Sequence, residues 1–481
     1  MAERRRLGID LGVSSKHTVV VLRGDGSLVC RRSCVPTRDS LLEVERAALR
    51  GAPEGTRLEV VMEPTGPAWL PVAVFFQTRG HVVFRASSAQ SADLRRFLSR
   101  HAKSNRIDAD ALARLPIFVG DLRPMRLQSG EQAGLDRRVR LCDRLVQEAG
   151  RRKSRIRALV REMLPMTPLR DELTKTDLAI LERTGGDPHR ILGMGRGRLV
   201  RLVKKVSQGH FGEDRAMTWM DAARQSLELY EQSPVIAFVD RAAVVKAELA
   251  LLKACEEELA KQQPVRDLRY HQVDSEGLMC SLPGVAEVGA PVLSVFLARP
   301  ANYPNGRHFV SHTGLVADSS ETGDSDHKGQ AMSKAGPGLL RTTLVRAANA
   351  ARQQDPQLAQ IYYRQMVERG ATHQKALCVV AAHLAERAYR VAVRGTPYEL
   401  RDVDGRPLTR EEARLIATTT WRVPEEVRRR RRNKKTRKAP QQFLNGNASA
   451  HGTARRPSPP SILPVPTPVG NPGQLRTNVS T

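Results

Sequence analysis

The stretch LGIDLG at residues 7–12 decides how the start of this chain folds. Every position in it is apolar or glycine except Asp10. Such a run predicts a buried strand, in which a carboxylate is unfavourable unless a cation compensates its charge. Gly12 follows two residues later and allows close approach of backbone or phosphate. We therefore expect a buried strand that ends at a functional acid.

A second buried strand is predicted by RLEVVMEPTG, residues 57–66, in which the apolar run Val60-Val61-Met62 leads to Glu63. Between the two strands the pattern predicts a hairpin with a Gly-Asp-Gly turn at residues 24–26, then a helix at residues 39–50. Parallel strands present ligands at their carboxyl ends, so we expect Glu63 to lie close to Asp10.

A helix with two acids is predicted by KSNRIDADALARL, residues 103–115. Positions four apart share a helix face, so Asp108 is the better inward ligand, and Asp110 caps the helix or faces solvent. Converging carboxylates that hold two metal ions about 4 Å apart are suited to phosphodiester chemistry. Oxygen ligands favour Mg²⁺ or Mn²⁺ over zinc. Asp10, Glu63 and Asp108, with Asp110 nearby, are thus candidate metal ligands.

The fold class predicted for residues 1–125 is α/β. Residues 67–80 and 91–115 have helical patterns, and residues 81–87 form a further strand. A hairpin followed by strand–helix units predicts a mixed sheet with flanking helices. The predicted elements come in a fixed order: a strand with Asp10, a hairpin, a strand that leads to Glu63, and an acidic helix. This order is the layout of an RNase H-like (RuvC-like) nuclease domain. The alternative is a non-catalytic sheet domain with ordinary acidic caps.

The composition points to a nucleic-acid partner. The 481 residues carry a formal net charge of +27, which repels itself unless a polyanion is present. The six cysteines form no CxxC pair, which argues against a zinc ribbon and fits a reduced cytoplasm. The N-terminus has no apolar signal region, and no apolar run reaches 18 residues, so we expect neither export nor a membrane span.

Residues 126–265 have a helical pattern, with apolar side chains every three or four positions. Two long amphipathic helices separated by a loop-rich insertion predict an antiparallel hairpin or a dimerising coiled coil. The charged positions of the first helix are nearly all arginine, among them Arg151 and Arg152. Repulsion between like charges favours a helix that faces RNA or DNA over a solvated face.

Residues 275–400 predict a mainly helical unit. SLPGVAEVGA, residues 281–290, resembles a helix-hairpin-helix, whose turn offers backbone N–H groups to a phosphate, although an ordinary tight turn is nearly as well supported. His308 and His312 are one helical turn apart, but without a third ligand we expect structural roles. Residues 423–481 predict a basic segment followed by a disordered tail.

Taken together, the motifs resemble the insertion-sequence transposases of the IS110 type, the bridge-RNA-guided recombinases. The resemblance covers residues 7–394. It rests, in order, on GIDLG, VVMEPTG, KSNRIDADALARL, SLPGVAEVGA, the segment from Gly314 to Gly323 and KGQAMSKAGPGLLR. It implies an N-terminal RuvC-like domain with a DEDD acid set, a coiled-coil region and a C-terminal transposase domain with a nucleophilic serine.

The resemblance also implies an activity and its partners. The protein would be a transposase that cuts and rejoins strands of donor and target DNA, directed by a structured RNA that the element encodes. Its active sites would be composed between the protomers of a dimer or tetramer. It would act in the bacterial cytoplasm, at the nucleoid.

Residue by residue, the resemblance implies Asp10 as the first acid, Glu63 as the second and Asp108 as the fourth. Asn105, two residues after Lys103, stands where the third acid is expected. An amide can ligate Mg²⁺ through its carbonyl oxygen but brings no charge. Three acids suffice, or Asp110 substitutes, or the metal site is weakened.

The implied nucleophile lies between Gly314-Leu315 and Ser333-Lys334-Ala335-Gly336. Where the resemblance implies a Ser-Gly pair, this chain has Thr322-Gly323. We choose Ser320 as the nucleophile, with Thr322 next; turn chemistry is the alternative role for either. The candidate cations that contact nucleic acid are Lys103, Arg151, Arg152, Lys328, Lys334 and Arg341.

Two alternatives remain open from the sequence. The first is a RuvC-like metal-dependent nuclease or resolvase that uses the N-terminal acids without a covalent intermediate. The second is a nucleic-acid-binding remnant without catalysis, which Asn105 and Thr322 suggest because each replaces an expected catalytic residue.

Overall fold

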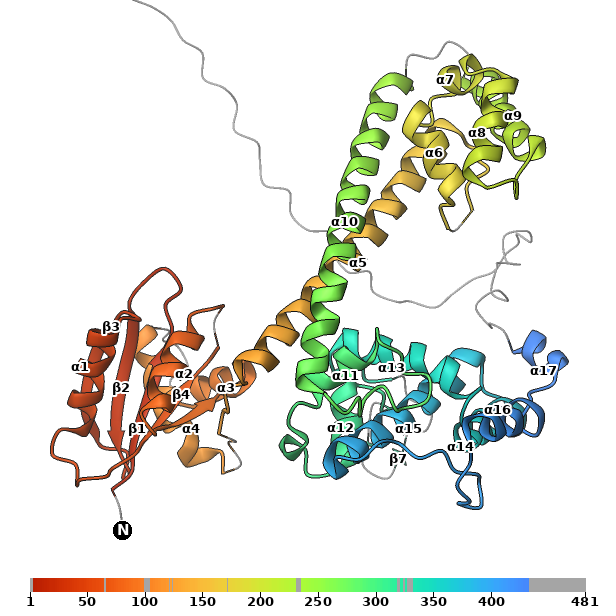
Figure 1. Ribbon diagram of the computed structural model, residues 1–481. Helices are drawn as coiled ribbons and strands as arrows, with labels where there is room; N and C mark the ends of the chain where they lie inside the picture. Colours follow the sequence, from red (N-terminus) through yellow and green to blue (C-terminus); the bar gives the residue numbers. More distant parts are fainter. Residues whose placement is uncertain are drawn as a thin grey trace, which may run out of the picture.

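The computed structural model describes most of the chain up to Arg431. The described residues are 3–431 without residues 65, 99–103, 121, 123, 171, 231–234, 318–320, 323–324 and 327–331. Figure 1 shows an N-terminal unit built on a sheet, a pair of long helices, and helical units at either end of that pair. The α/β-plus-α class predicted from the sequence is confirmed at this level.

Five strands form one mixed sheet in the order β3-β2-β1-β4-β5. The pairs β1–β2 and β2–β3 are antiparallel, whereas β1–β4 and β4–β5 are parallel. The predicted hairpin is thus confirmed, and it forms one side of the sheet. The strands are β1 (Arg5–Asp10), β2 (His17–Arg23), β3 (Leu28–Cys34), β4 (Leu58–Met62) and β5 (Val82–Arg85).

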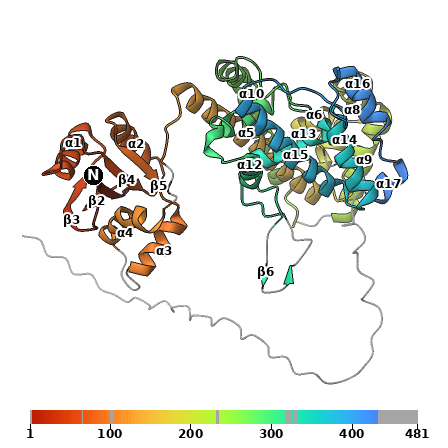
Figure 2. The same cartoon turned by 90° about the horizontal axis from the view of Figure 1, so that it is seen from below.

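Helices cover both faces of this sheet (Figure 2). α1 (Arg38–Leu49) and α2 (Trp69–Thr78) pack on the face that carries Ile9 and Met62. α3 (Ser88–Leu98) and α4 (Asn105–Phe118) pack on the opposite face, against Val61 and Val20. Alternating side chains of the central strands therefore enter two separate apolar layers.

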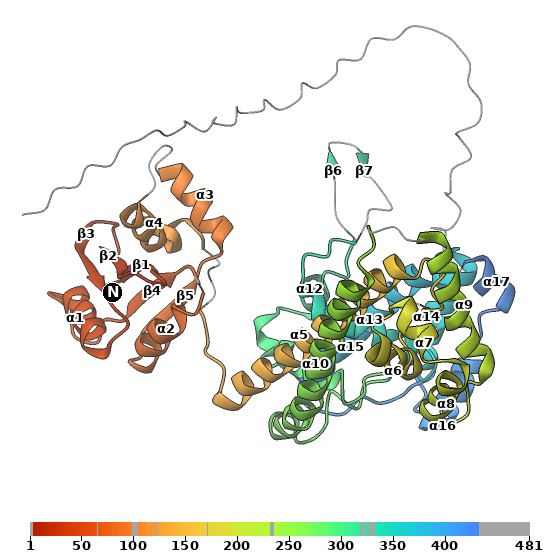
Figure 3. The same ribbon diagram turned by 90° about the horizontal axis from the view of Figure 1, so that it is seen from above.

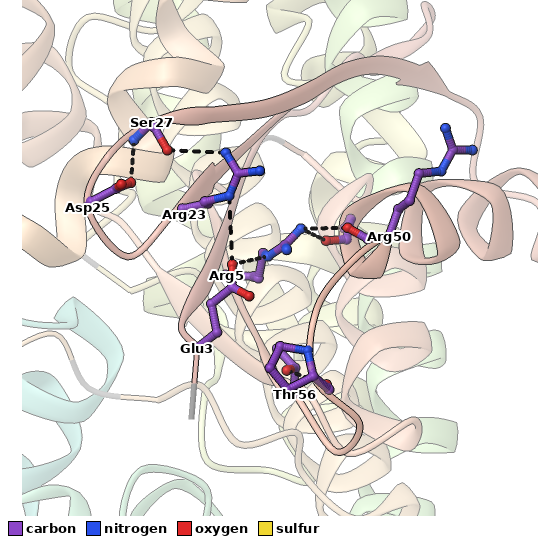
Figure 4. A network of polar contacts seen from close by, with 9 residues as sticks. Glu3, Arg5, Arg23, Asp25, Ser27, Arg50 and Thr56 are labelled. Carbon is purple, nitrogen blue, oxygen red and sulfur yellow. Dashed lines mark hydrogen bonds and ion pairs between the residues drawn. The ribbon is translucent and has the colours of Figure 1, made fainter. Parts of the chain in front are cut away.

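A buried arginine fastens the edge of the sheet where β1 begins. Arg5 is 1 % exposed, and its Nη1 donates to the carbonyls of Ala48 at 2.9 Å and Arg50 at 3.2 Å, just where α1 ends. Its Nε donates to Glu3 at 2.8 Å (Figure 4). In the β2–β3 turn, the N–H of Ser27 donates to the carboxylate of Asp25 at 2.8 Å. The contacts of Arg5 satisfy a guanidinium that the sheet edge would otherwise bury unpaired.

Gly8 lets α4 lie directly on β1. A Cβ atom at this position would lie 1.9 Å from the carbonyl oxygen of Ala109 and 2.3 Å from the nitrogen of Ala113. Because both are backbone atoms of a packed helix, Gly8→Ala should lower the free energy of unfolding by about 3 kcal/mol. Chemical denaturation measures this effect. Gly24→Ala is the control, since its Cβ would meet nothing closer than 3.6 Å, and equal stability of the two variants would refute the close packing.

Glu45 forms a buried ionic contact between α1 and the end of α2. Its carboxylate accepts from Arg79 at 2.6 Å and from His81 Nε2 at 2.8 Å, while the Leu58 N–H donates to His81 Nδ1 at 3.2 Å. Burial alone would raise the pKa of Glu45, but the hydrogen bonds and charges of Arg79 and His81 outweigh it and lower the pKa.

The lowered pKa of Glu45 predicts a stability effect that depends on pH. The stabilisation is fully present above the ordinary glutamate pKa and is lost as the pH falls through the lowered value. Glu45→Gln should therefore cost about 2 kcal/mol at pH 7, and less at each step below about pH 4. Urea denaturation of parent and variant across this range measures the difference, and a gap that stays constant down to pH 3 would contradict it.

The two long helices α5 (Gly130–Met163) and α10 (Phe238–Val273) pack along each other in opposite directions. Arg152, late in α5, contacts Glu248, early in α10, at 3.0 Å, and Arg138 contacts Gln262 further along. The antiparallel hairpin predicted from the sequence is thus present.

The insertion between these helices is helical, so the prediction of a loop-rich segment is wrong. It contains α6 (Lys175–Thr184), α7 (Pro188–Gly193), α8 (Arg196–Val206) and α9 (Glu213–Tyr230). Its core includes Trp219, and Arg215 pairs with the buried Asp177 at 2.6 Å. Its short helices depend on local caps, such as the capping box of Thr174, which an apolar periodicity does not reveal.

The C-terminal unit is helical around one core, with α13 and α15 at its centre. The ring of His312 lies 5.5 Å from that of Tyr303, and desolvation lowers the pKa of His312. The elements are α11 (Ala290–Phe296), η1 (Pro300–Asn302), α12 (Gly306–Thr313), β6 (Glu321–Thr322), β7 (Ser325–Asp326), α13 (Gly338–Ala351), α14 (Pro356–Tyr363), η2 (Arg364–Glu368), α15 (His373–Arg394), α16 (Arg410–Thr419) and α17 (Glu425–Arg430).

The expected helix-hairpin-helix at residues 281–290 is not formed. Residues 275–284 make successive turns instead of a helix, because the Asp274 carboxylate accepts from the N–H groups of Leu278 and Met279 and holds the chain in a turn. The Gly284 N–H donates to Gln354 at 2.8 Å, so it is already satisfied within the protein. The Pro283-Gly284 segment is therefore an ordinary turn that packs on α13.

The packed part of the chain extends past residue 423. Val423 is 2 % exposed, and the Arg431 side chain donates to the Gly370 carbonyl. The first residues of the predicted basic tail therefore belong to the C-terminal unit, and residues 432–481 lie outside the described part. Among the described helices, none combines the length and apolar character that crossing a membrane requires.

Candidate active site

Strand register brings Asp10 and Glu63 to the same edge of the sheet. Ile9 is paired with Met62 in the parallel ladder of β1 and β4, and the two acids are the next residue of each strand. Side chains alternate along strands, so both acids leave the sheet on the side of α3 and α4. Both are half-buried.

Ser91 on α3 contacts the second acid directly. Its hydroxyl donates to Glu63 Oε2 at 2.5 Å. α3 begins shortly after β5 ends, so its first turn lies at the carboxyl edge of the sheet, where Glu63 also lies. This hydrogen bond holds one oxygen of the carboxylate in a fixed direction.

Asp108 lies toward the same edge because α4 runs opposite to β1. Gly8 in β1 meets the middle of α4, and Gly26, in the turn beyond the other end of the sheet, lies near Arg114. The first turn of α4 is therefore over the carboxyl end of β1. Asp108 Oδ1 accepts from Arg95 Nη1 on α3 at 3.1 Å, and both side chains are about three-quarters buried (23 % and 25 % exposed).

The other two candidate ligands on α4 are placed differently. Asn105 is the first residue of the helix and is exposed, after the N-cap residue Ser104. The carboxylate of Asp110 accepts from Arg114, four residues on, at 2.7 Å. Asp110 is thus committed to an ion pair along the helix surface.

The donor chemistry at this edge suits an oxygen-preferring divalent cation, since the candidates are carboxylates and one amide. In the described residues, however, no three His, Cys, Asp or Glu side chains are grouped closely enough to hold a metal ion together. Arg95 occupies one oxygen of Asp108 in this conformation. The structure thus places the acids at one edge without assembling a closed ligand set.

The loop predicted to carry the nucleophile is fastened at both ends. Arg341 Nη1 lies 3.1 Å from the Gly336 carbonyl and 3.3 Å from those of Thr313 and Lys334. A Cβ at Gly336 would lie 1.9 Å from the His312 carbonyl, so the two ends of the loop touch. The sequence predicts that Arg341 contacts phosphate, and in the structure its Nη1 donates to backbone carbonyls of its own loop.

Between these ends the structure describes a short ribbon. In the β6–β7 pair, Thr322 lies opposite Ser325, and Figure 3 shows the ribbon away from the surrounding helices. Lys334 is exposed. Three predicted residues lie outside the described part: Ser320, Lys328 and Lys103.

Comparisons with known proteins identify the chain. Residues 7–165 match the sequence model of a transposase family described as DEDD transposases of the IS110 type, and residues 276–364 match that of the "Transposase IS116/IS110/IS902 family". The two matches together span more than half of the chain. The protein belongs to the IS110 family of transposases. It is therefore an enzyme of DNA transposition, and its partner is DNA.

A curated relative of this IS110-family transposase comes from Streptomyces coelicolor. It is named "Insertion element IS110 uncharacterized 43.6 kDa protein" and is 27 % identical over 406 residues, which cover 82 % of this chain and 95 % of the relative. The matched regions contain both candidate sites, because the acids lie within residues 7–165 and the loop within residues 276–364. Helices α6–α9 lie between the two matches.

The arginines of α5 are less available to nucleic acid in this transposase than their sequence suggests. Arg152 pairs with Glu148 at 2.6 Å and with Glu248 at 3.0 Å, and its side chain is only 20 % exposed between α5 and α10. Arg151 is exposed and also contacts Glu148, at 2.8 Å. Arg152 is chiefly a contact between helices, because α10 supplies Glu248, which the pattern of α5 alone does not show.

Sequence reasoning missed two residues of the acid edge, Ser91 and Arg95. They contact Glu63 and Asp108, respectively. The available signal was their spacing: positions 91 and 95 share one face of a helix that follows a strand ending at the same edge.

Proposed function

We propose that this transposase exchanges strands between donor and target DNA through a Ser or Thr hydroxyl of the 314–336 loop, assisted by a carboxylate centre at Asp10, Glu63 and Asp108. The observation that carries the proposal is the register of β1 and β4, which places Asp10 and Glu63 one residue beyond the Ile9–Met62 pair. An RNase H-like domain at residues 1–125 is the arrangement that best accounts for acids at this edge.

The carboxylates have the character of ligands for a divalent cation, with Mg²⁺ or Mn²⁺ favoured by their oxygen donors. When bound, such an ion would stabilise negative charge that develops on a phosphate. Asp10 and Glu63 would form the fixed part of the site, since Asp10 ends β1 and Glu63 directly follows β4. Ser91 holds one oxygen of Glu63, and Asp108 would join them from α4 once Arg95 moves aside.

The covalent step conserves phosphodiester bonds. The hydroxyl oxygen of Ser320 or Thr322 forms a bond to a DNA phosphorus, and the bond from phosphorus to the leaving sugar oxygen breaks. The proton of the hydroxyl ends on that sugar oxygen. A sugar hydroxyl of the other DNA strand then attacks the same phosphorus and releases the protein hydroxyl, so no external energy source is required. Lys334, exposed at the end of the loop, would hold the phosphate.

We further propose that a structured RNA directs the reaction and that the protein acts as a dimer or tetramer. The net charge of +27 exceeds what a short DNA contact needs and supports a second polyanion. The helices α5 and α10, in the region from 126 to 265, are long enough to pair with a second copy as a coiled coil. The unit at 275–400 would carry the nucleophile, and the chain from 423 on would tether nucleic acid in the cytoplasm, at the nucleoid.

The RNA proposal predicts a copurifying transcript. Expressed with its flanking element DNA, the protein should retain one discrete RNA from the element through washes at about 0.15 M salt, and should release it as the salt is raised further, because a folded guide makes many phosphate contacts. Sequencing of the extracted RNA measures this. Expression without the flanking DNA is the control, and a protein that exchanges strands equally well in both preparations would refute RNA direction.

A further inference from the structure

A pocket lined by arginines lies in the C-terminal unit, away from both candidate sites. α13 and α14 form one wall, the start of α15 another, and the α16–α17 segment closes it. Glu425 is the acid in its lining. Six side chains carry the argument: Arg352, Tyr362, His373, Arg422, Arg428 and Arg429.

Arg352 is held in a fixed position in this pocket. Its guanidinium carbon lies 4.4 Å from the centre of the Tyr362 ring, and its Nε and Nη2 donate to Asn349 Oδ1 at 3.1 and 3.0 Å. Within the described part of the chain it forms no ion pair. Burial lowers the pKa of Arg352, and the charge of Arg428 lowers it further. A fixed guanidinium thus faces further cations, and the one carboxylate in the lining, that of Glu425, forms no ion pair with it in the described part of the chain.

The side chains in the other walls of the pocket are also held in place by contacts within the protein. The Tyr362 hydroxyl and His373 Nδ1 are 2.7 Å apart, and burial, with the charges of Arg352 and Arg428, lowers the pKa of His373. Arg428 and Arg429 lie on α17, which is held by the buried Val423 before it and by the contact of Arg431 with the Gly370 carbonyl after it. The arginines are therefore presented by a packed helix.

Several guanidinium groups around one pocket repel each other, and a bound anion removes that repulsion. The planar fork of arginine matches the oxygens of a phosphate in particular. We propose that this pocket binds a phosphate group of a nucleic-acid strand. The assignment to phosphate rests on the pocket alone, whereas the assignment to nucleic acid rests on the proposed function.

Inorganic phosphate titrated into the full-length protein at low salt, followed by calorimetry, tests the pocket directly. We expect binding that weakens about tenfold in Arg428→Ala and in Arg422→Ala. Arg430→Ala is the matched control, since it removes the same charge from α17 outside the lining. Parent-like phosphate affinity in both pocket variants, or an equal loss in the control, would overturn the proposal.

Single-stranded DNA with and without a 5′-phosphate then identifies the source of the phosphate. If an internal phosphate occupies the pocket, Arg428→Ala reduces the salt dependence of binding by about 0.7 for both strands. If the occupant is a terminal phosphate, only the phosphorylated strand responds. Unchanged binding of both strands overturns the nucleic-acid assignment. Because Asp10 and the 314–336 loop are intact in these variants, loss of the strand-transfer activity itself is a separate result.

Discussion

Replacing Asp10 with alanine should lower the rate of strand transfer by about 10³-fold or more, and Glu63→Ala should have an effect of the same order. The two acids are the part of the centre that the sheet itself positions, one residue past the Ile9–Met62 pair. Neither belongs to an apolar core, so the melting temperature should change little. Recombination of donor and target plasmids by purified protein measures the rate, with thermal unfolding recorded on the same samples.

Asp110→Asn is the matched control for the acid variants. It removes a carboxylate from α4, the helix that also carries Asp108. This carboxylate forms an ion pair with Arg114, and the two side chains are each 32 % exposed. Its effect should stay within about threefold in rate and 1 kcal/mol in stability. If Asp110→Asn loses as much activity as Asp10→Ala, Asp110 fills the place of the missing third acid. If Asp10→Ala keeps the parent rate, the acid centre has no part in the reaction.

The sequence predicted the strands that lead to Asp10 and Glu63 well because its signals are local. The apolar runs that end at Asp10 and Glu63 define β1 and β4, and the hairpin turn at residues 24–26 separates β2 from β3. Parallel pairing of β1 with β4 then follows from the general placement of strand–helix units. A single chain segment does not show which side chains elsewhere in the protein contact an acid. Here Ser91 and Arg95, both on α3, contact Glu63 and Asp108, respectively.

Where the structure departs from the sequence pattern, the cause is a polar contact that the pattern does not locate, either between distant segments or within a turn. Arg152 looks like a free cation in α5 until α10 supplies Glu248. Arg341 looks like a free cation in the sequence, but its Nη1 contacts the backbone where the two ends of the loop meet. The expected helix before residue 283 is replaced by turns because Asp274 takes the backbone N–H groups that follow it. In each case a polar side chain is satisfied by a partner that periodicity does not locate.

The covalent intermediate is the second large prediction. Ser320→Ala or Thr322→Ala should abolish a protein–DNA adduct that the parent forms on nicked or suicide substrates, a loss of about 10³-fold or more in strand transfer. Ser320→Ala is expected to have the larger effect. Both positions belong to the loop whose ends Arg341 ties together, so a substitution within the loop leaves that tie intact. Denaturing gel electrophoresis of labelled DNA shows the adduct as a band that protease removes.

Ser333→Ala is the matched control for the nucleophile. Ser333 lies at the end of the same loop, but its hydroxyl is buried and finds no hydrogen-bond partner among the described residues, so DNA does not reach it in this conformation. It should retain the adduct. Retention of the adduct in both Ser320→Ala and Thr322→Ala would exclude these two hydroxyls. Strand cleavage without an adduct in the parent would instead favour hydrolysis at the acid centre, because water then attacks the phosphorus and the protein forms no bond to DNA.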